Sequence, residues 1–303
     1  MKISVAMATY NGEKYIREQI DSILNQTVQD FEIVVCDDCS SDGTWSILED
    51  YSNHDNRVKA FRNGDNLGFK KNFEKTITLC QGDYVALCDQ DDIWTTDHLE
   101  VLLNVMKDGV QISCGRPLFV DENNKELPKK YDYFRMVRAP ISNEDTARHI
   151  FLGKSTYQGA SMLIRRSFFD VALPIPDGVN YHDTWFAALA AVMNGFIYVD
   201  KYIMRYRRIS NSVTYKTKFV SAFRYLVRHT IHDNVMPDRL VMIQEIEKRI
   251  KNPSSNQQKL LRRFEMMHMR KNTVLGRIAN LPYRLYYFRS IYANDGIHIF
   301  DFS

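Results

Sequence analysis

Long hydrophobic runs are absent from this chain of 303 residues. No stretch approaches the roughly 18 consecutive apolar residues that a transmembrane helix needs. The first residues, MKISVAMATYNG, lack the long apolar segment of a signal peptide, and we therefore expect a cytoplasmic protein. Internal repeats and low-complexity tracts are also missing. The composition, 45% hydrophobic and 25% charged, is that of a globular protein with one large domain plus appendages or two modest domains.

Cysteine is scarce and odd in number, with Cys36, Cys39, Cys80, Cys88 and Cys114 making five. Four of them lie in or beside apolar runs where a small thiol packs well, so we expect reduced core thiols. Cys36 and Cys39 match C-x-x-C, but no second pair or histidine at zinc spacing accompanies them. A redox motif of this kind normally opens a helix, whereas this one follows a strand-like run. A zinc or redox role is therefore only a minor alternative.

The net charge of +3 hides an uneven distribution. Residues 216–303 contain 16 Lys and Arg against 7 Asp and Glu, which leaves 24 against 30 for the first 215 residues. Within 259–290 eight basic residues face one acidic residue. Such an excess predicts a polyanionic partner, for example phospholipid headgroups or nucleic acid.

Short apolar runs alternate with amphipathic stretches over the first 120 residues. The apolar runs have the length and β-branched content of buried strands and cover 2–10, 31–38, 57–63, 83–90 and 110–120. The amphipathic stretches follow the helical period and cover 13–26, 43–53, 68–80 and 95–107. This alternation predicts an α/β fold with a parallel, right-handed sheet, in which ligands lie at the carboxyl ends of the strands.

The pattern changes after residue 120. An irregular segment at 131–143 is expected to be a loop, and two further strands, 161–169 and 195–208, enclose a helix at 182–194. Beyond residue 215 the pattern is helical and basic, with prolines as natural breaks.

Polar side chains collect where the first four predicted strands end. The clusters are Thr9-Tyr10-Asn11-Gly12, residues 37–44, residues 63–68 and Asp89-Gln90-Asp91-Asp92. Each of the first three is also compatible with ordinary turn and capping chemistry. The fourth places three carboxylates within four residues, although a helix cap needs only one. Like charges this close raise one another's pKa unless a cation or a set of donors neutralises them, so we expect a positive group nearby.

Five motifs in order carry a family resemblance: ATYNGEKYIREQIDSILNQT, DDCSSDGT, NLGFKKN, GDYVALCDQDDIW and HDTW. Together, over residues 3 to about 213, they resemble the inverting glycosyltransferases of family 2. The resemblance implies a GT-A (Rossmann-like) mostly parallel sheet flanked by helices, a nucleotide-sugar donor and a divalent cation, Mn2+ or Mg2+. It implies a GT-A domain over 1–215, with a nucleotide-sugar half at 1–110 and an acceptor half at 111–215. A basic helical C-terminal extension, 216–303, follows.

The resemblance also implies roles for residues of the donor site. Asp89-Gln90-Asp91 corresponds to the D-x-D motif, with Asp91 as metal ligand and Asp89 near the ribose or sharing the metal. Asp38 matches the aspartate that accepts a hydrogen bond from the pyrimidine base. The remaining expected nucleotide-sugar contacts are Thr9, Tyr10, Asn11, Glu13, Lys71, Gln90, Arg207 and Arg208. Ile209 stands where the family often has a histidine, which puts a third protein ligand for the metal in doubt.

Asp183 occupies the family's place for the catalytic base, which must take a proton from the acceptor hydroxyl. A helix N-cap is the alternative reading of Asp183, because the helix TWFAALAAVMN begins there. His182 is expected to be a packed residue, and Trp185 is either a sugar platform or core.

The motif variant CDQDDIW with HDTW looks like enzymes that build bacterial surface polysaccharides. It favours dTDP-rhamnose as donor, with UDP-hexoses next, and a glycan or polyprenyl-linked glycan as acceptor. One alternative is a nucleotidyltransferase, but the first strand is followed only by Gly12 and not by a glycine-rich loop. The other is a basic-tailed nucleic-acid-binding protein. We expect no nucleic-acid partner and assign the tail to peripheral membrane contact or a homodimer.

Overall fold

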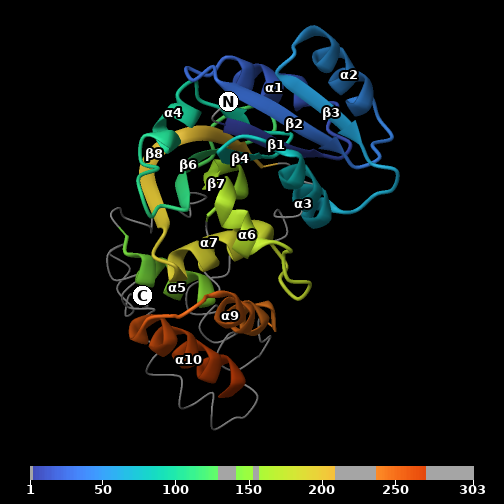
Figure 1. Ribbon diagram of the computed structural model, residues 1–303. Helices are drawn as coiled ribbons and strands as arrows, with labels where there is room; N and C mark the ends of the chain where they lie inside the picture. The colour runs from blue at the N-terminus through green and yellow to red at the C-terminus, as the bar shows by residue number, and fades with distance from the viewer. Residues whose placement is uncertain (1–2, 129–140, 153–156, 209–236, 271–303) are drawn as a thin grey trace, which may run out of the picture.

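The computed structural model describes residues 3–128, 141–152, 157–208 and 237–270 (Figure 1). The strands found there are β1 (Ile3–Thr9), β2 (Phe31–Asp37), β3 (Val58–Arg62), β4 (Tyr84–Cys88), β5 (Ile93–Trp94), β6 (Ile112–Val120), β7 (Met162–Arg165) and β8 (Phe196–Arg207). The α-helices are α1 (Ile16–Leu24), α2 (Thr44–His54), α3 (Phe69–Leu79), α4 (His98–Leu103), α5 (Asn143–Phe151), α6 (Phe169–Ala172), α7 (His182–Val192), α9 (Pro237–Arg249) and α10 (Ser255–Arg270). Two 3-10 turns, η3 (Gly159–Ser161) and η4 (Arg166–Phe168), flank β7.

The strands form one sheet in the order β3-β2-β1-β4-β7-β6-β8-β5. The first four of these strands are parallel, as the alternating sequence pattern predicts. Beyond β4 the sheet is mixed, because β7 runs antiparallel to both β4 and β6, and β8 returns parallel to β6. The predicted α/β fold is therefore confirmed, with a parallel half joined to a mixed second half.

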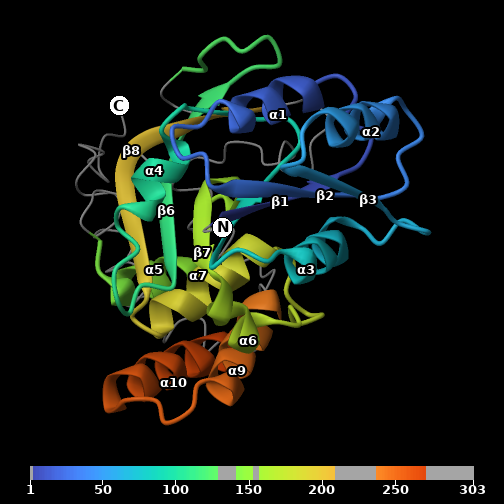
Figure 2. The same ribbon diagram turned by 45° about the horizontal axis from the view of Figure 1, so that its top comes forward.

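Helices cover both faces of the parallel half. Figure 2 shows α1 and α2 on one side of β1, β2 and β3, and α3 on the other. Alternate residues of each strand enter different cores: Val5 and Ile33 pack with α1 and α2, whereas Ala6 and Val34 pack with α3. Every residue of β2 is buried, which agrees with its apolar run at 33–36, and the two carboxylates of the strand, Glu32 and Asp37, are buried with it.

Several boundaries differ from the sequence prediction. β7 ends at Arg165, and the predicted strand continues instead as η4 and α6. The short β5 and the helix α5 were not predicted, and α4 is shorter than the 95–107 stretch. Helix α5 begins where the irregular segment was expected to end, because Ser142 caps it by accepting a hydrogen bond from the Asp145 amide at 3.1 Å. Most of that segment, 129–140, lies outside the described residues.

The C-terminal helices α9 and α10 share a core with the mixed half of the sheet and with α7. Their buried residues Ile243, Leu261 and Phe264 belong to the same cluster as the buried side of α7. The Arg249 guanidinium donates to the carbonyls of Val171 and Ala172, both at 3.0 Å. Both views place these helices at the end of the molecule away from α1 and α2 (Figures 1 and 2). The expected boundary at residue 215 lies outside the described residues and stays a prediction.

All five cysteines are free thiols, and four of them are buried, as expected for core residues. Cys39 is the half-exposed one, and its Sγ lies 3.1 Å from the Asn63 carbonyl oxygen. None of the helices in the described ranges is long and apolar enough to cross a membrane.

Candidate functional site

The loops that follow β1 and β2 are joined by side chains of the predicted donor site. The Asn11 amide donates to the Ser40 hydroxyl at 2.8 Å, and Asn11 Oδ1 accepts from the Ser41 amide at 2.8 Å. Glu13 Oε2 accepts from the Gly43 amide at 2.9 Å. Asn11 has a positive φ of 50°, a conformation that asparagine tolerates better than most residues. Asn11 and Glu13 therefore hold the two loops together at the carboxyl edge of the sheet.

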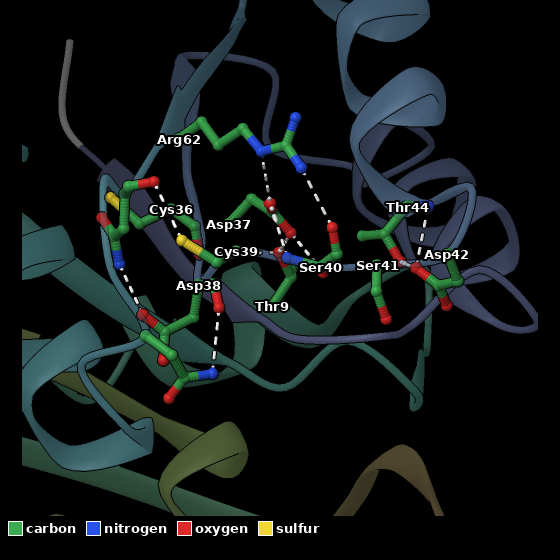
Figure 3. Close-up of polar contacts among 12 residues, drawn as sticks. Thr9, Cys36, Asp37, Asp38, Cys39, Ser40, Ser41, Asp42, Thr44 and Arg62 are labelled. Carbon is green, nitrogen blue, oxygen red and sulfur yellow. Dashed lines mark hydrogen bonds and ion pairs between the residues drawn. The ribbon is translucent and has the colours of Figure 1, made fainter.

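Asp37, which sequence reasoning did not select, organises the turn after β2. Figure 3 shows Thr9, Ser40 and Arg62 gathered around its buried carboxylate. The Ser40 amide donates to Oδ2 at 3.1 Å, the Thr9 hydroxyl lies 3.4 Å from Oδ1, and Arg62 Nε lies 3.5 Å from Oδ2. Thr9 is thus buried against Asp37 at the end of β1.

Asp38, the predicted base contact, is buried and accepts three hydrogen bonds from the loop at 63–68. Its Oδ1 accepts from Asn63 Nδ2 at 2.7 Å and from the Leu67 amide at 2.8 Å. Its Oδ2 accepts from the Gly68 amide at 2.8 Å. Gly68 has a φ of 76°, which favours glycine at this turn. A carboxylate offers about four acceptor positions, so one remains for a ligand.

Gln90, in the middle of the D-x-D motif, pairs with the backbone of Tyr10. Its Oε1 accepts from the Tyr10 amide at 2.8 Å, and its Nε2 donates to the Tyr10 carbonyl at 3.0 Å. A Cβ on Gly12 would collide with the same amide group. Gln90 therefore joins the loop after β4 to the loop after β1, and the Tyr10 side chain is left half exposed at this edge.

The carboxyls of the acidic loop have raised pKa values. Burial, with added repulsion from Asp91 and Asp183, raises the pKa of Asp89 to about 7. Burial raises the pKa of Asp91 to about 6, although the charge of Arg207 acts in the opposite direction. Burial and its two acidic neighbours raise the pKa of Asp92 well above the ordinary value. The protein alone supplies too little positive charge for this loop.

A divalent cation fits this loop by its chemistry. Asp89 and Asp91 offer the carboxylate oxygens that Mn2+ and Mg2+ accept, and their raised pKa values report charge that a cation would neutralise. No group of three or more His, Cys, Asp or Glu side chains able to hold a metal occurs within the part of the chain that the structure describes. The remaining ligands would then come from the donor or from water.

Arg207, the predicted diphosphate contact, is buried with its guanidinium turned toward the chain itself. Nε donates to the Asp91 carbonyl at 2.9 Å, Nη1 donates to the Glu122 carbonyl at 3.0 Å, and Nη2 pairs with Glu18 at 2.6 Å. The ring of Tyr15 lies 4.5 Å from the guanidinium carbon. The backbone amide of Arg207 also donates to Asp92 Oδ1 at 2.9 Å. In this structure Arg207 fixes the acidic loop against β8 and α1.

Asp183 lies in the first turn of α7, and its charge contributes to the raised pKa of Asp89. The capping residue of α7 is Tyr181, and no side chain caps the helix, so the N-cap reading of Asp183 is wrong. Asp183 instead accepts from the neighbouring Thr184 amide. The predicted base is thus coupled electrostatically to Asp89, one of the predicted metal ligands.

The neighbours of Asp183 are core residues. His182 is buried, with its ring centroid 4.3 Å from that of Phe73. Trp185 is fully buried and its Nε1 donates to the Ala172 carbonyl at 2.8 Å, which rules out the sugar-platform reading.

Two of the predicted donor contacts, Lys71 and Arg208, have partners within the chain. Lys71, in the first turn of α3, is half exposed and its Nζ lies 2.7 Å from Glu74 Oε2. The Arg208 amide donates to the Val120 carbonyl at 2.9 Å, and Ile209 lies outside the described residues.

Residues 4–172 match the protein-family model described as Glycosyl transferase family 2. The chain belongs to this family. A family 2 relative, the putative teichuronic acid biosynthesis glycosyltransferase TuaG of Bacillus subtilis, is 36% identical over 113 residues, which cover 37% of this chain and 44% of TuaG. The Escherichia coli protein named UDP-Glc:alpha-D-GlcNAc-diphosphoundecaprenol beta-1,3-glucosyltransferase WfgD is 30% identical over 141 residues, 45% of this chain and 55% of WfgD. The chain spans about half the length of these curated relatives.

Solved structures confirm the family 2 fold. TarS of Staphylococcus aureus, in complex with UDP-GlcNAc, superimposes with a TM-score of 0.63 at 20% identity, over 99% of this chain and 77% of that chain. The mannosyltransferase PcManGT from Pyrobaculum calidifontis, in complex with GDP-Man and Mn2+, gives a TM-score of 0.58 at 16% identity, over 97% and 79% of the two chains. At these identities the likeness establishes the GT-A fold alone.

Sequence reasoning missed Asp37, Arg62 and Glu18 as residues that build this family 2 site. Asp37 carried a signal, since it precedes Asp38 in the DDCSSDGT motif. Arg62 and Glu18 carried none, because each meets its partner only after the sheet has formed.

Proposed function

We propose that this family 2 chain is an inverting, metal-dependent glycosyltransferase of cell-surface polysaccharide synthesis. It moves a sugar from a nucleoside diphosphate donor to a hydroxyl of a glycan or polyprenyl-linked glycan. The observation that supports this most is the half-buried pair Asp89 and Asp91, whose pKa values are raised to about 7 and about 6, with the charge of Asp183 adding to the rise at Asp89. Two carboxylates that can hold a cation and a third that can accept a proton are what transfer from a diphosphate to a hydroxyl requires.

At the donor end, Asp91 and Asp89 would hold Mn2+ or Mg2+, and the cation would supply positive charge for the leaving diphosphate. Thr9, Tyr10 and Asp38 lie on the nucleoside side, at the ends of β1 and β2. Gln90 keeps this edge in place through its pair of bonds to Tyr10. Arg208 is the remaining candidate for a direct diphosphate contact, since the Arg207 guanidinium is bound to the chain.

At the acceptor end, Asp183 takes the proton from the attacking hydroxyl. The hydroxyl oxygen forms a bond to the anomeric carbon while the bond from that carbon to the diphosphate oxygen breaks. The electron pair leaves with the nucleoside diphosphate. Because the hydroxyl approaches opposite the leaving group, the anomeric configuration inverts.

Donor choice is tested by presenting dTDP-rhamnose, UDP-Glc, UDP-GlcNAc and GDP-Man and measuring binding and slow hydrolysis with Mn2+, Mg2+ or EDTA. The motif variant favours dTDP-rhamnose, whereas WfgD is named for UDP-Glc and TarS was solved with UDP-GlcNAc. We expect one nucleotide sugar to be hydrolysed only when a divalent cation is present. Release of diphosphate from a nucleoside triphosphate and a sugar phosphate would instead favour a nucleotidyltransferase.

We place the enzyme at the inner face of the cytoplasmic membrane, held there by α10. The outward face of this helix exposes Lys259, Arg262, Met266 and Met269, while Leu261 and Phe264 are buried on the other side. A basic face with flexible apolar side chains suits an anionic lipid surface, where each Lys or Arg contributes about 1 kcal/mol. The tail beyond Arg270, with its further arginines, lies outside the described residues. A homodimer through the same face is the competing outcome.

A further inference from the structure

Two aromatic side chains stand exposed at the start of α7 and of α3. Phe69, the first residue of α3, is 44% exposed, and Tyr181, which precedes α7, is 40% exposed. Their ring centroids lie 6.4 Å apart, with 32° between the ring planes. Exposed apolar rings that gather in this way mark binding surfaces more often than packing faults.

The aromatic pair is held from both sides. Lys70 Nζ donates to the carbonyls of Val179 at 3.0 Å and Asp177 at 3.3 Å, which fixes the segment before Tyr181 against α3. Behind the pair, the His182 ring lies 4.3 Å from the ring of Phe73 and 6.2 Å from the ring of Phe69. The two rings thus rest on a buried aromatic layer and do not need to be ordered by a ligand.

Resting on the proposed function, we infer that Phe69 and Tyr181 form the stacking platform for the acceptor sugar. The occupant is a pyranose ring that presents a face of C–H groups, as β-linked glucose, galactose or N-acetylglucosamine does. Aromatic rings with few polar neighbours recognise that face, and nearby polar groups fix its orientation. Tyr181 lies two residues before Asp183, so a sugar seated on the pair brings its hydroxyls to the carboxylate that must deprotonate one of them.

A nucleobase is the competing occupant. The two residues directly before Phe69, Leu67 and Gly68, donate their amides to Asp38, the proposed contact of the base. The two occupants predict different binding data. A base platform contributes to nucleotide affinity, whereas an acceptor platform contributes only to binding of the glycan. The experiment below measures both quantities.

Saturation-transfer NMR with the methyl β-glycosides of glucose, galactose and N-acetylglucosamine, without nucleotide, measures sugar binding directly. Phe69→Ala and Tyr181→Ala are compared with Phe61→Ala, a matched exposed aromatic, 39% exposed, on the edge strand β3. We expect at least one glycoside to bind wild type, with its signal reduced about fivefold in the first two variants and unchanged in the third. Phe69→Leu and Tyr181→Leu keep apolar bulk and should lose most of the signal as well. Thermal melting confirms that the variants fold.

Calorimetry with UDP separates this proposal from the proposed function. Unchanged UDP affinity in Phe69→Ala and Tyr181→Ala supports the acceptor platform, and a parallel loss of UDP affinity overturns it in favour of base stacking. Equal glycoside signals in all variants, or no glycoside binding by wild type, also overturn it. Failure of wild type to bind any nucleotide sugar would contradict the proposed function and would leave the glycoside comparison intact.

Discussion

Replacement of Arg207 by methionine tests whether this arginine positions the acidic loop or binds the donor itself. Methionine keeps an apolar stem of similar length but removes the donors to the Asp91 carbonyl at 2.9 Å, to the Glu122 carbonyl at 3.0 Å and to Glu18 at 2.6 Å. Glu122 is exposed and Glu18 is 50% exposed, so both regain water and their loss contributes little. The Asp91 carbonyl loses a buried partner at a cost of about 1–3 kcal/mol.

Loss of the guanidinium from the Tyr15 ring, 4.5 Å away, adds about 1 kcal/mol. We therefore expect the free energy of unfolding to fall by about 2–4 kcal/mol, measured by urea denaturation. Because the freed loop carries Asp91, the Mn2+ concentration for half-maximal hydrolysis of the donor should rise about tenfold, which is about 1.4 kcal/mol.

Arg205→Met is the matched control. Arg205 lies two residues earlier on β8. Within the described ranges its side chain donates to Asn124, to Oδ1 at 2.7 Å and to the carbonyl at 3.2 Å, so its loss should leave the Mn2+ dependence unchanged. Arg207→Lys adds a second check, because a lysine restores charge but not the planar fork that reaches two acceptors. Recovery of wild-type activity in Arg207→Lys, or an equal shift in Mn2+ dependence in Arg205→Met, would refute the positioning role.

The remaining predictions concern the carboxyls and α10. Asp91→Asn should reduce transfer by about 3 kcal/mol or more, and activity within about threefold of wild type contradicts the ligand role. Asp92→Asn should retain activity, because burial and its acidic neighbours already favour the neutral carboxyl; a tenfold loss, roughly 1.4 kcal/mol, argues otherwise. Asp183→Asn should abolish turnover while calorimetry shows unchanged nucleotide affinity; a joint loss with a lower melting temperature indicates a structural role. Without divalent cations, the free energy of unfolding should fall as the pH rises from about 4 to about 7. In this range the folded protein retains protons on Asp89 and Asp91, whereas the unfolded chain, in which these carboxyls have the ordinary pKa of 3.8, releases them. Asp89→Asn should make the free energy of unfolding depend less steeply on pH. An identical slope in the variant would contradict the contribution of Asp89. Lys259→Glu with Arg262→Glu should reduce sedimentation with anionic liposomes at low salt, whereas the same change at the exposed Lys107 and Lys125 should not. Truncation at Lys259 is unsuitable for this test, because it removes the buried Leu261 and Phe264.

The elements of the parallel half could be predicted from the sequence because their patterns are local. Strands β1, β2 and β4 are buried almost throughout and therefore have mostly apolar runs, the edge strand β3 is partly exposed, and each helix between them buries one face. The position of Asp89 and Asp91 followed for the same reason, since a polar cluster after a buried strand in a parallel sheet lies at its carboxyl edge. The switch to antiparallel pairing at β7 left no comparable period in the sequence, whereas the unpredicted α5 does bury one face, at Thr146, Ala147, Ile150 and Phe151.

The roles of individual side chains were decided only by the tertiary structure. Whether Arg207 faces a ligand or the Asp91 carbonyl depends on how β8 pairs beside β6 and β5, more than 80 residues away along the chain. Whether Trp185 is a platform or core depends on α6, and whether Phe69 meets Tyr181 depends on Lys70 holding a loop that comes over 100 residues later. The raised pKa values of Asp89 and Asp91 likewise require burial, and that of Asp89 also depends on the charges of Asp91 and of Asp183 from α7. The residue types present in this site can be recognised from neighbours in sequence. A contact, a buried charge or an exposed ring depends instead on neighbours in space, and these come together only when the sheet and its helices have formed.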